Sequence, residues 1–143
     1  MIGSPRSLSL FLMKIRFSSI IGWTAVALVS ALTLFSGVME FVMPMNDPKV
    51  VEFVTRLGIQ GLEYHLGVAK IVIAVLFLVP RTSTVGFVLM VGYYGGALAT
   101  HITHGAPVAE YAMIYIVLGL LTLSAYIRNP ELLTRIKGKP VVA

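Results

Sequence analysis

The chain has 143 residues, of which 57% are hydrophobic and only 12% are charged, and its mean hydropathy is +0.91. This composition excludes an ordinary soluble domain and predicts an integral membrane protein embedded in a lipid bilayer. Because the chain has no cysteine, disulfides, thiolate ligands and iron–sulfur ligation are excluded. The formal charge of +5 comes from basic residues beside hydrophobic segments and not from a continuous stripe, so no nucleic-acid partner is predicted.

Four apolar segments have the length expected of membrane-spanning helices, which need about 20 mostly apolar residues. The predicted spans are 18–43, 62–79, 84–102 and 108–127. The second span contains Lys70, whose ammonium group is costly in lipid unless it faces other helices or water. The connections after the second and third spans are short, so neighbouring helices should be antiparallel. The predicted fold class is therefore all-α, an integral membrane four-helix bundle.

The segment between the first two spans, D47-PKVVEFVTRL-G58, predicts a short amphipathic helix at the membrane interface. Asp47 can cap its N-terminus, Pro48 can occupy its first turn, and Gly58 can end it. This helix is expected either to rest on the bundle as a connector or to move as a lid.

Basic residues predict the orientation of the chain in the membrane. An even number of spans places both termini on one side, together with eight of the 11 basic residues. These eight are Arg6, Lys14, Arg16, Arg81, Arg128, Arg135, Lys137 and Lys139. The other side holds only Lys49 and Arg56, so the positive-inside rule predicts that both termini are cytoplasmic.

The domain organisation follows from these spans. Residues 1–17 are predicted to be an N-terminal cytoplasmic extension, 18–130 the four-helix transmembrane domain, and 131–143 a basic cytoplasmic tail. Met13 is an alternative start to Met1, because a lysine follows it directly before the first apolar run.

Polar residues gather in the outer half of the predicted bundle, near the outer ends of the spans. Glu40 and Lys70 can neutralise each other if the first two spans are adjacent. Two alternatives remain open: a fixed ion pair that sets helix register, or a lysine that reaches the outer interface. The candidate ligand-binding residues are Glu40, Lys70, His101, His65, Tyr94 and His104.

In the third span, G92-YYGGALAT-H101 combines small residues with a terminal histidine. Gly92, Gly96 and Thr100 recur at intervals of four and form a face that permits close helix approach, so these three residues are assigned to helix packing. Replacing Gly96 by leucine is therefore expected to damage packing.

Histidines and tyrosines near this segment leave several alternatives. Tyr93 and Tyr94 point in different directions, so at most one is expected to face the bundle interior. His101 and His104 either join a polar site or form hydrogen bonds at the headgroup level. Two axial haem ligands would require His65 and His101 at matching depths, which nothing in the sequence establishes. No metal site and no covalently bound cofactor are predicted.

The chain resembles the DoxX-like family of small four-span bacterial membrane proteins over about residues 18–130. The resemblance is carried by F35-SGVMEF-V42, V54-TRLG-I59, L66-GVAKIVIAVLFLVP-R81 and G92-YYGGALAT-H101. It implies a location in the bacterial cytoplasmic (inner) membrane. Because related proteins are named for thiosulfate oxidation with quinone reduction, or for other membrane oxidoreductase complexes, it also implies a quinone ligand and an oxidoreductase partner subunit.

Three functions remain as hypotheses. The leading one is a small membrane subunit that binds or positions a lipophilic partner, quinone by family association, in a pocket bordered by Glu40, Lys70 and His101. The alternative is a noncatalytic membrane assembly or scaffold protein whose buried charges fix helix packing. A second copy of the chain, in a homo-oligomer, is the alternative partner to an oxidoreductase subunit. The third is an enzyme that uses a carboxylate and a histidine on an isoprenoid-like substrate.

Overall fold

The computed structural model describes the backbone of residues 5–43 and 46–128, with the side chains of 20–43 and 46–127. This part of the chain is all-helical and contains no strand. The five helices are α1 (Pro5–Val42), α2 (Pro48–Arg56), α3 (Glu63–Leu78), α4 (Ser83–Thr103) and α5 (Val108–Arg128).

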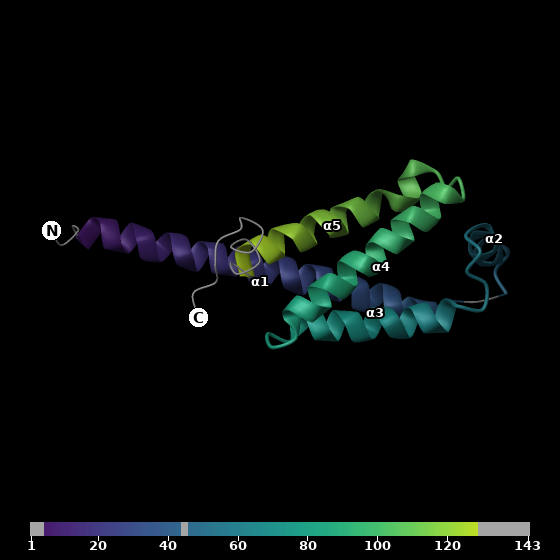
Figure 1. The fold of residues 1–143 in the computed structure, drawn as a ribbon, viewed down its shortest axis with the longest axis horizontal. Coiled ribbons are helices and arrows are strands. Elements are labelled where there is room, and N and C mark those ends of the chain that lie inside the picture. The colour runs from purple at the N-terminus through teal and green to yellow at the C-terminus, as the bar shows by residue number, and fades with distance from the viewer. Residues whose placement is uncertain (1–4, 44–45, 129–143) are drawn as a thin grey trace.

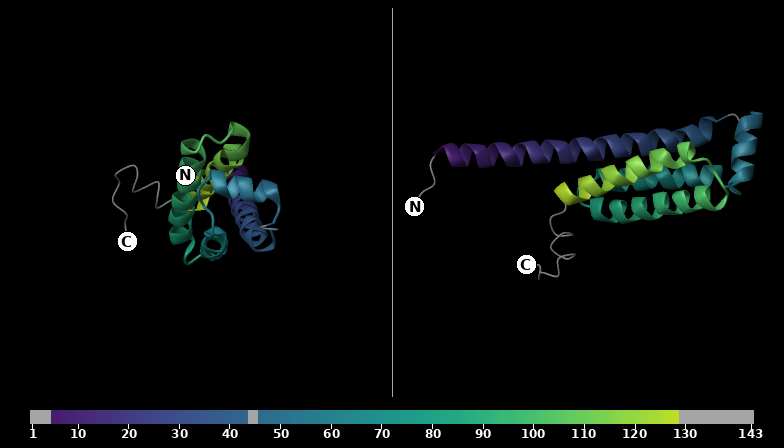
Figure 2. Two further views of the ribbon diagram at one scale, coloured as in Figure 1. Left: turned by 90° about the vertical axis from the view of Figure 1, so that its right-hand side faces the viewer. Right: turned by 90° about the horizontal axis from the view of Figure 1, so that it is seen from above.

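The four long helices form two crossing pairs (Figure 1). α1 packs against α3 and α5, and α4 also packs against α3 and α5, so each long helix has two neighbours. The pair α4 and α5 diverges from the pair α1 and α3 toward the end where α2 lies (Figure 1). α2 lies across that end, whereas α1 extends beyond the other helices at the opposite end (Figure 2).

Three of the described helices are long and apolar enough to cross a membrane, over Ile20–Val42, Ser83–Thr103 and Val108–Ile127. α3 is not among them, because it has only 16 residues. At about 1.5 Å per residue it is about 24 Å long, shorter than a hydrocarbon core of about 30 Å. The fourth span therefore stays a prediction.

The helix predicted between the first two spans is present as α2. Its N-terminus is capped by Asp47, whose carboxylate accepts a hydrogen bond of 2.9 Å from the backbone N–H of Lys49. Gly58 follows the helix with a φ of 65°, a left-handed conformation that favours glycine. Val54 and Leu57 are buried beneath the helix.

α1 begins at Pro5, well before residue 18, where the first span was predicted to start. The helix passes without a break through most of residues 1–17, which the sequence suggested as a separate extension. No glycine or proline occurs between Arg6 and Ile21, so nothing in the sequence interrupts it. The predicted tail, 131–143, lies outside the described residues.

The hydrophobic core lies where the two helix pairs cross. It is formed by buried side chains of all four long helices: Val26, Val29, Ala74, Phe77, Met90, Tyr94, Ile114, Val117 and Leu121. The helices are held close together here, and the space between the two pairs widens from this core toward α2.

Glycines permit the closest helix approaches. A Cβ added at Gly86 of α4 would meet the backbone of Phe77 on α3. A Cβ added at Gly67 of α3 would lie 2.9 Å from the carbonyl oxygen of Gly37 on α1. A side chain at either position would therefore force these helices apart.

Candidate functional site

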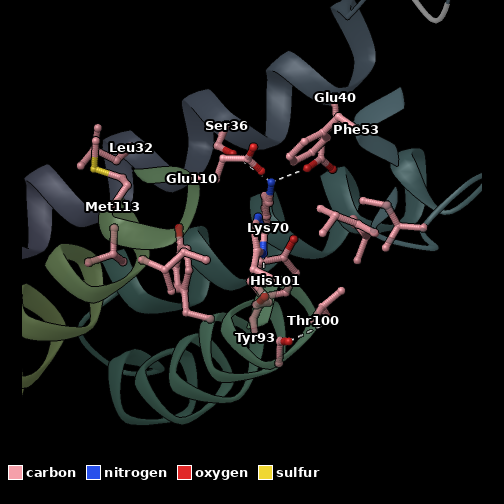
Figure 3. A pocket seen from close by; sticks show the side chains of 18 of the residues that line it. Leu32, Ser36, Glu40, Phe53, Lys70, Tyr93, Thr100, His101, Glu110 and Met113 are labelled. Atoms are coloured by element: carbon pink, nitrogen blue, oxygen red, sulfur yellow. Dashed lines mark hydrogen bonds and ion pairs between the residues drawn. The ribbon is translucent and has the colours of Figure 1, made fainter. Parts of the chain in front are cut away.

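A cavity of about 640 Å³ lies between the two helix pairs at the end covered by α2 (Figure 3). Its apolar lining comprises Leu32, Phe35, Phe53, Leu57, Ile59, Leu66, Ala97, Met113, Ile114 and Val117. Its polar lining comprises Ser36, Glu40, Lys70, Tyr93, Tyr94, Thr100, His101 and Glu110, and Gly92 and Gly96 complete the wall. Every one of the five helices, or the residues that directly follow it, contributes to this lining.

An ion pair between α1 and α3 forms part of the cavity wall. The Lys70 ammonium donates hydrogen bonds to the Glu40 carboxylate and, at 2.9 Å, to Ser36 Oγ. The predicted contact between Glu40 and Lys70 is therefore confirmed. The side chains of Lys70 and Glu40 retain only 12% and 18% of their exposure, so the pair is largely shielded. Lys70 Nζ also lies 5.8 Å from the centre of the Tyr93 ring, within range of a cation–π interaction.

Glycine spacing explains why the two charges meet. Gly37 precedes Glu40 by three positions on α1, and Gly67 precedes Lys70 by three positions on α3. Residues three apart share a helix face, so the close approach of the two glycines also brings the charged side chains together. A Cβ at Gly37 would lie 3.0 Å from the Lys70 Cβ, which shows how little space separates the helices.

His101 has a defined tautomer at the cavity. Its Nδ1 lies 2.8 Å from the Ala97 carbonyl oxygen, which can only accept, so Nδ1 donates and carries a proton. In the neutral ring this leaves Nε2 with a lone pair. The ring lies 6.1 Å from the Phe53 ring of α2 and 6.5 Å from the Tyr111 ring of α5, centre to centre. The ring of His101, a residue of α4, therefore lies near both α2 and α5.

A buried hydrogen bond joins α1 and α4 beside the cavity. The Thr33 hydroxyl donates to the Val29 carbonyl oxygen at 2.8 Å, so it accepts from the Tyr94 hydroxyl, also at 2.8 Å. The Tyr94 proton is thus engaged within the protein. Tyr93 also lines the cavity, so the prediction that at most one of these tyrosines faces the interior is wrong. Their rings meet edge to face, with centres 5.5 Å apart.

A family model described as the DoxX-like family matches residues 24–125. The chain belongs to the DoxX-like family. The matched segment contains Glu40, Lys70 and His101 and all the other residues that line the cavity. This membership and the three apolar helices identify a membrane protein. No curated protein and no solved structure matches the chain.

Among the candidate ligand-binding residues of this DoxX-like protein, Glu40, Lys70, Tyr94 and His101 lie together at the cavity. His65 and His104 do not line it. Both are exposed, and His104 Nδ1 donates back to the Thr100 carbonyl oxygen of its own helix at 2.9 Å. His65 lies five positions before Lys70 on α3, about 140° around the helix, so the two side chains cannot share a face.

The small-residue row of α4 differs from the sequence expectation. A Cβ added at Gly92 or Gly96 would meet nothing within 4 Å, so neither glycine packs against another helix of the described chain. Gly92, Gly96 and Thr100 line the cavity instead. The physical reason is that α4 diverges from α3 toward the end where α2 lies (Figure 1).

The lining residues that were not among the predicted site residues include Ser36, Tyr93 and Phe53. Ser36 had a usable signal, because it lies four positions before Glu40 on the same face of α1. Phe53 had none, because the sequence does not show how α2 is placed over the bundle.

A second ion pair attaches α2 to the start of α5. Arg56 Nη2 lies 2.5 Å from Glu110 Oε2, and the two side chains are 35% and 31% exposed. Pairs with this degree of exposure contribute only about 0–1 kcal/mol, so the link is weak. Within the described residues, no cluster of three or more histidine and acidic side chains could hold a metal ion.

Proposed function

We propose that this DoxX-like protein binds a lipophilic ligand of the quinone class in the cavity beside Glu40 and Lys70. The observation that carries the proposal is a largely apolar cavity of about 640 Å³ with a shielded, hydrogen-bonded ion pair in its wall. Small-molecule sites typically have volumes of about 300–1,000 Å³ and combine apolar walls with a few polar groups.

The polar groups suit a flat ring with oxygen at its edge. A lysine ammonium has three N–H donors, and two of those on Lys70 bind Glu40 and Ser36. The third can donate to a quinone carbonyl oxygen. His101 Nε2 can accept from the hydroxyl of the reduced form, and the Phe53 and Tyr93 rings offer aromatic surface for stacking. The site therefore suits a ligand that is apolar apart from a few hydrogen-bonding groups.

The proposal includes a membrane arrangement. All four long helices span the membrane as a bundle, with α3 as the short fourth span, because α1 and α4 flank it and Lys70 is paired within the protein. α2 lies at the outer interface as an amphipathic helix, and both termini are cytoplasmic at a bacterial inner membrane. In this arrangement the protein positions its ligand for a partner subunit of a membrane oxidoreductase complex.

Quinone extraction tests the proposal. The protein is purified in a mild detergent, and its lipids are extracted and analysed by mass spectrometry, for the wild type, Lys70→Ala and Glu40→Gln. We expect about one quinone per wild-type chain and less in both variants. Gly95→Ala is the matched control, because Gly95 is exposed, does not line the cavity, and has room for a Cβ. Equal retention in all four proteins, or none in any, contradicts the proposal.

One observation favours a second candidate, a noncatalytic scaffold. The matched spacing of Gly37 to Glu40 and Gly67 to Lys70 makes the ion pair a device for fixing the register of α1 and α3. Exchanging the two charges, Glu40→Lys with Lys70→Glu, separates the roles. If the protein is a scaffold, the double variant should recover the stability and the partner binding that each single variant loses. If the cavity binds quinone, the double variant should recover stability but not quinone binding, because the hydrogen-bond donor and acceptor have changed places.

A further inference from the structure

We propose that the ligand is a lipid with a single long chain, which leaves the cavity sideways between α3 and α4, past Gly92 and Gly96. This inference rests on the proposed function, because it assigns the entry route and the ligand class of the same cavity. Three features of the chain lead to it: a covered outer end, a lateral opening, and the small size of the residues at that opening.

The outer end of the cavity is covered by α2 and the residues that follow it. Phe53, Leu57 and Ile59 line the cavity from this side, and Leu57 is only 3% exposed. The ion pair between Arg56 and Glu110 adds a weak link between α2 and α5. A ligand arriving from outside the membrane would have to displace this apolar cover, so direct entry from water is disfavoured.

The cavity reaches the surface of the chain at α4. Gly92 and Gly96 both line the cavity and are exposed, and a Cβ added to either meets nothing within 4 Å. We place the opening on the α3 side, because Gly96 lies about 60° from Tyr93 around the helix and the Tyr93 ring is near the Lys70 ammonium of α3. Figure 1 shows α4 diverging from α3 toward the end where α2 lies.

The opposite gap, between α1 and α5, is less open to a chain. The lining residues there include Leu32, Phe35 and Met113 (Figure 3 labels Leu32 and Met113). Phe35 and Met113 are exposed, so the cavity reaches the surface here as well, but beside large side chains and not beside bare backbone. At the gap between α3 and α4, two glycines one turn apart leave the helix backbone bare. The wider route is therefore the glycine side.

The depth of the opening indicates the ligand class. Gly96 lies seven residues before the end of α4 at Thr103, which is about 10 Å along the helix axis. If α4 spans the membrane, the opening lies at the level of the acyl chains. An isoprenoid or alkyl chain leaving there enters hydrocarbon, while its polar ring remains beside Lys70. Two glycines separated by one helical turn of about 5.4 Å leave room for one chain, which favours a single-chain lipid over a phospholipid.

The test compares two benzoquinones with the same ring, one carrying a decyl chain and one without it. Their binding is measured in nanodiscs for the wild type, Gly96→Leu and Gly95→Leu. Gly95→Leu is the matched control, because it adds the same side chain to the same helix at an exposed position outside the cavity lining. Partitioning into the bilayer is common to all three proteins, so it cancels when they are compared.

We expect Gly96→Leu to weaken binding of the decyl compound by about tenfold, the effect of losing contacts to about two methylene groups, while the tail-free ring binds within about threefold of wild type. Gly95→Leu should bind both like the wild type. Equal weakening of both quinones by Gly96→Leu, or no weakening, overturns the lateral route. Failure of the wild type to bind either quinone overturns the proposed function, and this inference with it.

Discussion

Removing the Lys70 ammonium should destabilise the protein more than removing both members of its ion pair. Lys70→Met keeps the length and apolar stem of the side chain but deletes the charge and the 2.9 Å hydrogen bond to Ser36. Within the described residues, Glu40 Oε2 is already shielded from solvent without a hydrogen-bond donor. The variant therefore leaves both oxygens of a shielded carboxylate without their partner.

The size of this effect follows from the burial of the pair. Breaking a buried ion pair from one side costs about 3–5 kcal/mol, whereas replacing both members by apolar residues is often close to neutral. Lys70 and Glu40 keep 12% and 18% of their side-chain exposure, so we expect a loss near the lower limit, about 3 kcal/mol. For the double variant Lys70→Met with Glu40→Leu we expect a change within about 1 kcal/mol of the wild type.

Unfolding in mixed micelles, followed by circular dichroism, measures these free energies. Arg56→Met is the control, because it breaks a more exposed pair and should cost no more than about 1 kcal/mol. The result that refutes this reasoning is a double variant at least as unstable as Lys70→Met. That outcome would show that the loss comes from packing around the side chains and not from an unpaired charge.

Three further substitutions test other parts of the structure. Gly86→Ala should destabilise the protein by about 1–3 kcal/mol in the same assay, because the added Cβ would meet the Phe77 backbone. The control Gly95→Ala should be neutral or slightly stabilising, and equal effects of the two substitutions would contradict the close crossing of α3 and α4. Tyr94→Phe should cost about 0.5–1.5 kcal/mol through loss of its 2.8 Å hydrogen bond, and an unchanged free energy of unfolding would contradict that bond. His101→Ala should preserve the far-ultraviolet circular dichroism spectrum but lower quinone retention, and an unfolded variant would instead show that the histidine is structural.

Much of the helical architecture could be predicted from the sequence. Apolar runs, one of which includes Lys70, and the turn residues Pro80 and Pro107 placed three long helices to within about two residues of their observed limits, which is the usual uncertainty of such boundaries. The start of α1 was missed, because a segment with basic residues can form the beginning of a helix before the charge-free apolar run starts. The contact between Glu40 and Lys70 was predicted on the condition that the first two spans are adjacent, and the packing of α1 against α3 meets that condition.

The role of the glycines in α4 could not be predicted. Their spacing shows that a helix face is free of side chains, but not whether another helix, a cavity or lipid lies against it. That depends on how strongly the two helix pairs diverge, which is set by the packing at Gly86 and Phe77, a contact between separate helices. The same limit applies to His65 and His104. The sequence indicated their depth along the helices but not the direction in which their side chains point.

The central claim is that the cavity between the helix pairs holds a quinone-type ligand. Photo-crosslinking with an azidoquinone tests this claim most directly. Trypsin cleavage at Arg81 and Arg128 yields a peptide, 82–128, that contains every cavity-lining residue of α4 and α5. The label is predicted to fall on this peptide near Tyr93 and His101, and excess unlabelled quinone should abolish it. Labelling that is spread over the lipid-facing sides of the helices and is unaffected by competitor would contradict the account.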